Sequence, residues 1–326
     1  MASPLLSSAA EDHVQQPRWV NADLWPRGAV ARAALGVCLV VALGAAACGD
    51  TVGGNKPAGK AVDRDAQIQR FVRRAYLDLS GHVPSDSEMT GATARLRDAG
   101  NTATARGALV DDLIAADGFA TAWFEEFENS VFGGNSLEQQ YALVCGLVRG
   151  LACKTCTEVD PCACTCDPMR PFATERTQLR TSAADLRSGT KTSTIERRYA
   201  MAGGYFAIAG SPENRVTALF DDFLSRAAEP DEIENGRAMI IGALFPPAPA
   251  GLLFHRLGGT YADLIDIVFS SEVYRESIVR RVFDRYLARS PSATELAHFV
   301  STLDANEPDA RGVVRAVVSS REYFDQ

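Results

Sequence analysis

One short pattern occurs three times in the sequence, and this repetition limits the possible folds more than any other feature. Each copy has apolar residues at helical spacing, then a proline, then a polar residue followed three positions later by glutamate. These pairs are Ser85 with Glu88, Asp231 with Glu234, and Ser292 with Glu295. Such a pair forms a capping box, in which each side chain accepts a hydrogen bond from the other residue's backbone amide. We therefore expect a helix to begin at the same place in every copy.

A second shared segment closes each copy. An apolar helical stretch ends at a pair of small or polar residues, and an aromatic residue (Phe119, Tyr274 or Tyr323) follows within one turn. Helical periodicity recurs through each copy, and no stretch shows the sustained alternation typical of strands. The predicted fold class is therefore all-α, with three related helical units and a cysteine-rich loop insertion. Each unit is expected to run as helix, proline, capping box, helix and helix.

These patterns divide the chain into six predicted segments. They are a lipoprotein-type signal peptide at residues 1–47, a flexible tether at 48–63, helical unit 1 at 64–135, the cysteine-rich insertion at 136–192, helical unit 2 at 193–275, and helical unit 3 at 276–326. Gly and polar residues dominate the tether, as is typical of flexible linkers.

The N-terminal segment has the features of an export signal. Arg27 and Arg32 precede an apolar stretch at residues 33–47, which is too short to cross a bilayer but typical of a signal peptide. Small residues then lead to Cys48, as in a lipoprotein cleavage site, although Ala45 stands where such sites usually have leucine. We predict lipidation at Cys48 and export to an outer or inner membrane, facing the periplasm or the cell surface. Secretion without a lipid and an uncleaved short anchor are the alternatives.

Two parts of the chain resemble families of bacterial proteins. Residues 70–132 resemble an uncharacterised domain common in planctomycete proteins and often found beside cytochrome c modules; residues 73–81, Pro84, residues 113–119 and Trp123 carry this resemblance. Residues 213–326 resemble a repeat of unknown function in bacterial surface proteins, itself similar to phycobilisome linker domains. That second pattern rests on residues 287–291 and 319–323, with Ala288 in place of the usual glycine. The resemblances imply a helical envelope module and bring no catalytic residues.

Six cysteines lie close together in the predicted insertion: Cys145, Cys153, Cys156, Cys162, Cys164 and Cys166. Because exported thiols become oxidised, we predict three disulfides that staple a loop too polar to fold alone, and the sequence leaves their connectivity open. A metal or iron–sulfur site that uses Cys153, Cys156 and two later cysteines is the alternative. Covalent haem is excluded, because Thr157 occupies the position at which a haem attachment motif has histidine.

Charge and motif content exclude several functional classes. The net charge of −8 and the lack of a long basic run argue against nucleic-acid binding. No serine-hydrolase elbow, phosphate-binding loop or zinc-protease motif occurs. Adjacent acids such as Asp221 and Asp222 point to different sides of a helix, so we interpret them as solvated residues. We therefore predict no catalytic residue and no cofactor, and the sequence leaves any metal ligands undetermined.

The favoured prediction is a non-enzymatic, lipid-anchored cell-envelope protein that binds or scaffolds a partner through its helical repeats, since stacked helical units present extended surfaces. Its expected partners are the membrane, through an N-terminal lipid, and an envelope or surface protein. The alternative is a redox or metal-binding accessory protein centred on the cluster from Cys145 to Cys166.

Overall fold

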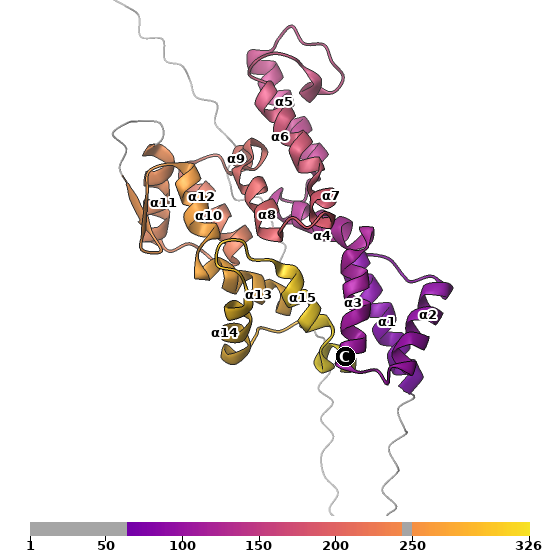
Figure 1. The fold of residues 1–326 in the computed structure, drawn as a ribbon. Coiled ribbons are helices and arrows are strands. Elements are labelled where there is room, and N and C mark those ends of the chain that lie inside the picture. The colour runs from indigo at the N-terminus through magenta and orange to yellow at the C-terminus, as the bar shows by residue number, and fades with distance from the viewer. Residues whose placement is uncertain (1–63, 243–249) are drawn as a thin grey trace, which may run out of the picture. The chain divides into compact units, whose positions relative to one another are not determined.

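The described residues form helices joined by turns and loops, together with one small sheet (Figure 1). The computed structural model describes residues 64–242 and 250–326. The all-α fold class is therefore confirmed. Cys48, the predicted signal peptide and the predicted tether lie outside the described residues. None of the described helices is long and apolar enough to span a membrane.

The first copy of the repeat contains four helices in sequence order: α1 (Arg64–Ser80), α2 (Asp86–Asp98), α3 (Ala103–Ala115) and α4 (Asp117–Val131). The apolar stripe expected along α1 is buried, including Phe71, Val72 and Leu79. At the start of α2 the Ser85 hydroxyl accepts from the Glu88 amide, and the Glu88 carboxylate accepts from the Ser85 amide. The capping box predicted here is thus confirmed.

The segment expected to be a cysteine-rich loop is largely helical, which corrects the prediction. It consists of α5 (Leu137–Ala152), the 3-10 turn η1 (Pro161–Ala163), α6 (Arg170–Arg180) and α7 (Ser182–Arg187), and α8 (Thr192–Met201) and α9 (Gly203–Ala209) follow. Helix α5 begins with a further capping box, formed by Ser136 and Gln139. That pair was visible in the sequence.

The second and third copies share one helix. The second copy comprises α10 (Pro212–Leu219), its π-helical continuation η2 (Phe220–Leu224), α11 (Pro230–Gly242), β1 (Gly251–Leu253), β2 (Arg256–Gly258) and α12 (Tyr261–Phe269). The third comprises α13 (Glu272–Leu287), α14 (Ala293–Thr302), α15 (Ala310–Val318) and α16 (Arg321–Asp325). Because α13 both closes the second copy and opens the third, the copies overlap. The predicted second unit, 193–275, contains α8 and α9 in addition to the repeat.

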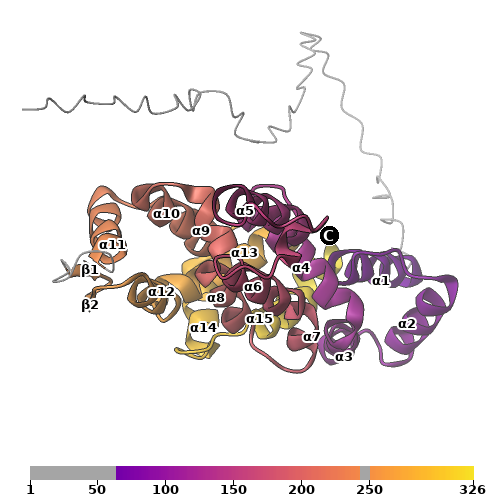
Figure 2. The same cartoon turned by 90° about the horizontal axis from the view of Figure 1, so that it is seen from above.

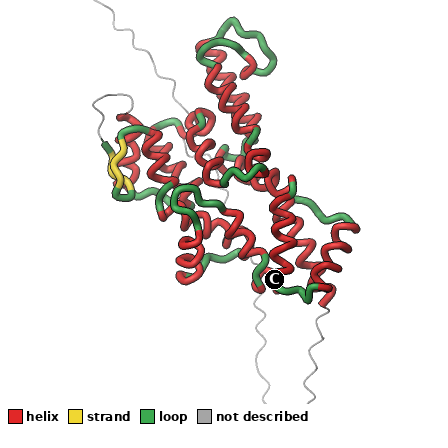
Figure 3. The backbone as a smooth tube through the Cα atoms, viewed as in Figure 1, coloured by secondary structure: helices red, strands yellow, loops and turns green. Residues whose placement is uncertain are grey.

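A small antiparallel hairpin of β1 and β2, yellow in Figure 3, lies against α11. The sequence analysis expected no strand here. Each strand is only three residues long, too short to show the alternation by which strands are recognised. Phe254 and His255 form the turn with positive φ angles of 48° and 63°.

The three copies share a more detailed geometry than the sequence pattern suggested. The first helix of each copy ends at a residue with positive φ: Gly81 (70°), Ser225 (54°) and Ala288 (53°). The next residue is basic, and it contacts both an aromatic ring six residues earlier and a carboxylate six residues later. The three sets are Tyr76–His82–Glu88, Phe220–Arg226–Glu232 and Phe283–Arg289–Glu295. This shared set identifies equivalent positions in the three copies.

The shared geometry corrects one predicted helix cap. Ser292 and Glu295 form the expected capping box at α14. In the second copy, however, α11 begins at Pro230, and the Glu232 carboxylate accepts from the Glu229 amide at 2.9 Å. Asp231 and Glu234 therefore lie inside the helix and do not cap it. The proline precedes the cap in the other two copies, but here it occupies the first helical position, which its fixed φ suits.

Contacts between distant copies complete the core. Within the third copy α13 contacts α14 and α15 (Figure 2). Two helices of this copy reach the first copy, since α15 packs against α3 and α16 packs against α1. The guanidinium of Arg74 lies 4.2 Å from the Tyr323 ring centroid, and it donates to the backbone carbonyl of Tyr286 at 2.8 Å. Burial of Phe71 thus depends on the last helix of the chain, since its ring meets Tyr323 and Phe324.

Candidate functional site

The six cysteines form three disulfides at one end of the α5–α6 hairpin. The bonded pairs are Cys145–Cys162, Cys153–Cys166 and Cys156–Cys164, with Cα atoms 5.2, 6.1 and 5.9 Å apart. The predicted disulfides are thus confirmed, and the structure selects one connectivity. Thiolate coordination of a metal requires free sulfur atoms, whereas each of these sulfurs is bonded to another. Within the described residues no group of His, Cys, Asp and Glu has the arrangement of a metal site.

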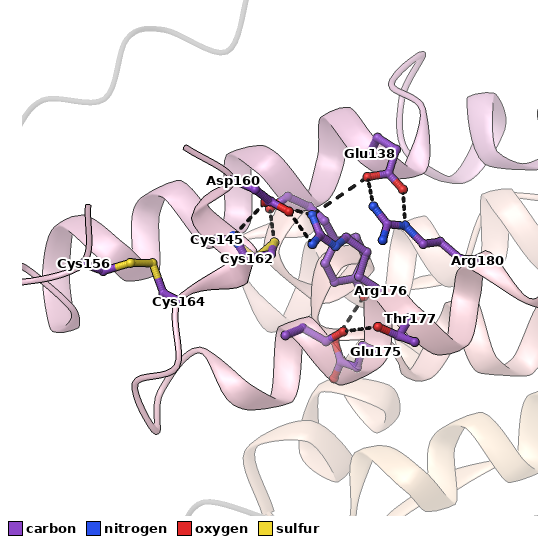
Figure 4. The surroundings of a disulfide bond; sticks show 12 residues. Glu138, Cys145, Cys156, Asp160, Cys162, Cys164, Glu175, Arg176, Thr177 and Arg180 are labelled. Carbon is purple, nitrogen blue, oxygen red and sulfur yellow. Dashed lines mark hydrogen bonds and ion pairs between the residues drawn. A yellow bond between two sulfur atoms is a disulfide. The ribbon is translucent and has the colours of Figure 1, made fainter. Parts of the chain in front are cut away.

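The first disulfide joins the middle of α5 to η1, and an ionic network holds the same region (Figure 4). The guanidinium of Arg176 on α6 donates to both carboxylate oxygens of Asp160, at 3.0 and 2.6 Å. Arg180 makes a second two-pronged contact with Glu138 at the start of α5. These hydrogen bonds hold the pKa values of Asp160 and Glu138 below their usual range. Both carboxylates are therefore ionised at neutral pH and pair with the two arginines of α6.

One face of α5 is apolar and exposed. Its leucines recur every four residues and are mostly accessible: Leu143 (58%), Leu147 (65%) and Leu151 (80%). Small residues precede each of them, namely Ala142, Gly146 and Gly150. A β-carbon added at either glycine would meet nothing within 4 Å, so no contact inside the chain requires glycine there. The opposite face of the helix is buried through Tyr141, Val144 and Cys145.

Sequence analysis missed this face, although its signal is present. From residue 142 onward a small residue followed by leucine occurs three times at intervals of four. Apolar residues on both sides of a helix normally indicate a fully buried helix. Only the structure reveals that α5 lies at a surface and which of its two apolar faces is exposed.

Buried tyrosine–carboxylate pairs are a second feature that the sequence did not reveal. In each, a tyrosine hydroxyl donates to a carboxylate from a different element: Tyr141 to Glu175, Tyr199 to Glu128, Tyr205 to Asp222, Tyr274 to Glu196, and Tyr323 to Asp78. Burial raises the pKa values of Glu128 and Glu175. The sequence separations, 17 to 245 residues, explain why no local pattern marks these pairs.

Asp222 is the most perturbed of these carboxylates. Burial raises its pKa to about 6, the neighbouring Asp221 carboxylate adds to the rise, and the Tyr205 hydroxyl and Arg281 oppose it. This corrects the interpretation of Asp221 and Asp222 as a solvated pair: Asp221 is exposed, whereas Asp222 is largely buried and bonded to Tyr205 at 2.9 Å. Adjacent helical residues do point to different sides, and here one side is the interior.

Replacing Asp222 with asparagine should stabilise the protein at neutral pH and leave it unchanged in acid. The folded-state pKa of about 6 exceeds that of an unfolded aspartate, about 3.9. The free energy of unfolding is therefore unaffected by Asp222 below pH 4, where the carboxyl is protonated, and it falls as the pH rises from 4 through 6. Asparagine keeps an acceptor for Tyr205 and carries no charge. Urea denaturation should show a gain of about 1–3 kcal/mol at pH 7.5 and none at pH 4.

The exposed carboxylate Asp98 supplies the matched control for this experiment. Its replacement by asparagine should change the free energy of unfolding by less than about 0.5 kcal/mol at both pH values. Equal stability of Asp222→Asn and the parent protein at pH 7.5 would contradict the assignment of Asp222 as a buried carboxylate that costs stability when ionised.

Comparison with known proteins identifies no relative. No protein-family model matches the sequence, and neither a curated protein nor a solved structure is significantly similar to it. The resemblances of residues 70–132 and 213–326 stay predictions.

Proposed function

We propose that the protein is an exported, lipid-anchored and non-enzymatic scaffold of the cell envelope, in which two copies pair through the exposed face of α5. The observation that carries the proposal is the row of accessible leucines at positions 143, 147 and 151 beside small residues at 142, 146 and 150. The three disulfides support the export component, because such bonds persist in oxidising compartments. The lipid anchor rests on the sequence pattern that ends at Cys48.

A second copy of α5 fits this face because the face is self-complementary. Residues four apart form ridges on a helix, and two helices cross at about −50° when these ridges interdigitate. Here one ridge is leucine, and the adjacent row is a groove of alanine and glycine. A two-fold axis places the leucine ridge of each copy over the groove of the other, so that the same patch is buried twice.

Charge and composition favour a protein helix over a lipid surface. Between residues 139 and 152 the only charged residue is Arg149, whose guanidinium donates to the Glu158 carbonyl at 3.0 Å. Pairing two copies therefore buries no run of like charge. Helices that lie in a membrane interface carry many basic residues on their polar face and bulky groups on the other. The groove at Gly146 and Gly150 benefits a closely approaching helix but offers little to lipid.

The redox alternative gains no support from the geometry. Exchange requires that a thiolate reach one of the sulfurs. Every disulfide contains at least one buried cysteine, and only Cys156 and Cys166 are partly exposed. A buried, braced disulfide suits a structural role.

Sedimentation velocity of the protein from residue 49 onward tests the proposal. We expect a monomer–dimer equilibrium at micromolar concentration. Leu147→Glu should weaken the dimer at least about tenfold, because it places a charge in an apolar contact. Gly146→Leu should do the same by filling the groove, although the fold of the monomer has space for it.

Leu77→Glu on α1 is the matched control, since Leu77 is also an exposed leucine on a helix but lies outside α5. It should leave the dimer unchanged. A protein that stays monomeric at about 100 μM, or a dimer that Leu147→Glu and Gly146→Leu leave intact, would show the proposal to be wrong.

A further inference from the structure

A cavity of about 430 Å³ lies where five elements meet, and the proposed α5 pairing does not involve it. Helices α4, α8, α13 and α15 line it together with η2. Part of its wall is apolar, formed by Trp123, Phe127, Ile278 and Val282. Its volume suits a small organic group, and an apolar wall with a few charged groups is typical of ligand sites.

The charges that line the cavity do not balance. Four carboxylates face it, from Glu126, Glu196, Asp222 and Asp284, but only two guanidinium groups. Both guanidinium groups are paired: Arg281 bonds to Glu196 at 3.0 Å, and Arg285 bonds to Glu126 at 2.7 Å. Among the described residues, Asp222 and Asp284 have no ion-pair partner. The cavity therefore favours a positively charged ligand.

Asp222 and Glu196 each have one carboxylate oxygen that accepts no hydrogen bond from the described residues. Oδ2 of Asp222 accepts from the Tyr205 hydroxyl, and Oε2 of Glu196 accepts from both Tyr274 and Arg281. Within the described part of the chain, no donor reaches Oδ1 of Asp222 or Oε1 of Glu196. A guanidinium binds best to a carboxylate with two free oxygens, whereas an ammonium is a point charge with three rotatable donors. Single free oxygens on separate carboxylates suit the ammonium.

We propose that this cavity binds a primary alkylammonium group, with the nitrogen at Asp222 and the alkyl stem against Trp123 and Phe127. An aromatic wall also attracts a cation through its ring face. A hydrated inorganic cation would gain nothing from the apolar wall, and an anion would meet the uncompensated carboxylates. The bound ammonium neutralises a buried carboxylate that costs the free protein stability. Asp222→Asn should therefore make the protein more stable and at the same time a poorer binder, a combination that misfolding cannot produce.

Isothermal titration calorimetry at pH 7.5 tests the proposal with n-pentylamine as the probe and 1-pentanol as its neutral counterpart. We expect the amine to bind and the alcohol to bind at least about tenfold more weakly, since only the amine pairs with Asp222. Asp222→Asn should reduce the affinity for the amine by about tenfold or more. Glu175→Gln is the matched control: it changes another buried, tyrosine-bonded carboxylate that does not line the cavity, and it should leave the affinity within about twofold.

A second ligand distinguishes the two sources of an alkylammonium group. If N-acetyl-lysine-N-methylamide binds as well as pentylamine, the natural ligand is a lysine side chain of a peptide; if only pentylamine binds, it is a free amine. Either result supports the proposal. Failure of pentylamine to bind, equal binding of pentanol, or unchanged affinity in Asp222→Asn would overturn it. None of these results depends on whether the protein is a dimer, so the two proposals fail separately.

Discussion

Replacing Arg281 with methionine is expected to lower the free energy of unfolding by about 3–5 kcal/mol. Glu196 is only 1% exposed, and Arg281 is its only ion-pair partner among the described residues, at 3.0 Å. Tyr274 supplies one neutral hydrogen bond at 2.9 Å. Without the guanidinium, a buried carboxylate keeps its desolvation cost and loses its counter-charge. Urea denaturation at pH 7.5 measures the loss.

Two further variants separate the ion pair from simple truncation. Arg280→Met changes the neighbouring arginine, which pairs with Glu276 at a half-exposed site, and it should cost less than about 1 kcal/mol. The double variant Glu196→Gln/Arg281→Met removes both charges and should recover at least half of the loss, because a buried polar pair costs most when one partner stays charged. If Arg281→Met costs no more than Arg280→Met, the ion pair between half-buried Arg281 and buried Glu196 does not contribute as we describe.

Removing the disulfide between Cys145 and Cys162 by a double change to alanine should cost about 3 kcal/mol. The bond joins residues 17 apart and is buried between α5 and η1, so it both restricts the unfolded chain and packs these two elements together. Hydrogen exchange of the amides of α5 measures the local loss, and thermal denaturation measures any wider effect.

The pair Cys156–Cys164 provides a comparison within the same hairpin. It joins residues only 8 apart, and Cys156 is partly exposed, so its removal should cost less, about 2.5 kcal/mol or below. The order of the two losses is the informative result. Equal protection of α5 in the parent protein and in Cys145→Ala/Cys162→Ala would mean that the other two disulfides and the hydrogen bonds of Arg176 and Arg180 suffice to hold the hairpin together.

Local sequence predicted those features that depend on residues three or four positions apart. Ser85 and Ser292 begin helices because a cap and its glutamate meet within one turn, whatever the remainder of the chain does. The same logic failed at Asp231, where a proline fits equally well before a cap or inside the first turn. In the second copy Glu232 is the residue that bonds to both the Arg226 guanidinium and the Glu229 amide, and α11 accordingly begins at Pro230.

Disulfide formation could be expected from the density of cysteines, but their pairing could not. Fifteen connectivities were compatible with six cysteines. The choice of Cys162 as the partner of Cys145 follows from the position of η1 against α5, and that position depends in turn on Arg176 and Asp160.

By itself the sequence determined the helical class of the protein, the repetition of its units and two of its three predicted helix starts, since all of these arise from short-range periodicity and hydrogen bonding. Tertiary structure alone decided which face of α5 is exposed, and it alone brought Asp222, Glu196 and Arg281 to one cavity. Those residues come from η2, α8 and α13, which are joined by long-range hydrogen bonds: Ser277 on α13 donates to the Phe223 carbonyl of η2, and Tyr274 on α13 donates to Glu196 on α8. Burial and proximity are properties of the packed core, so no local pattern in the chain encodes them.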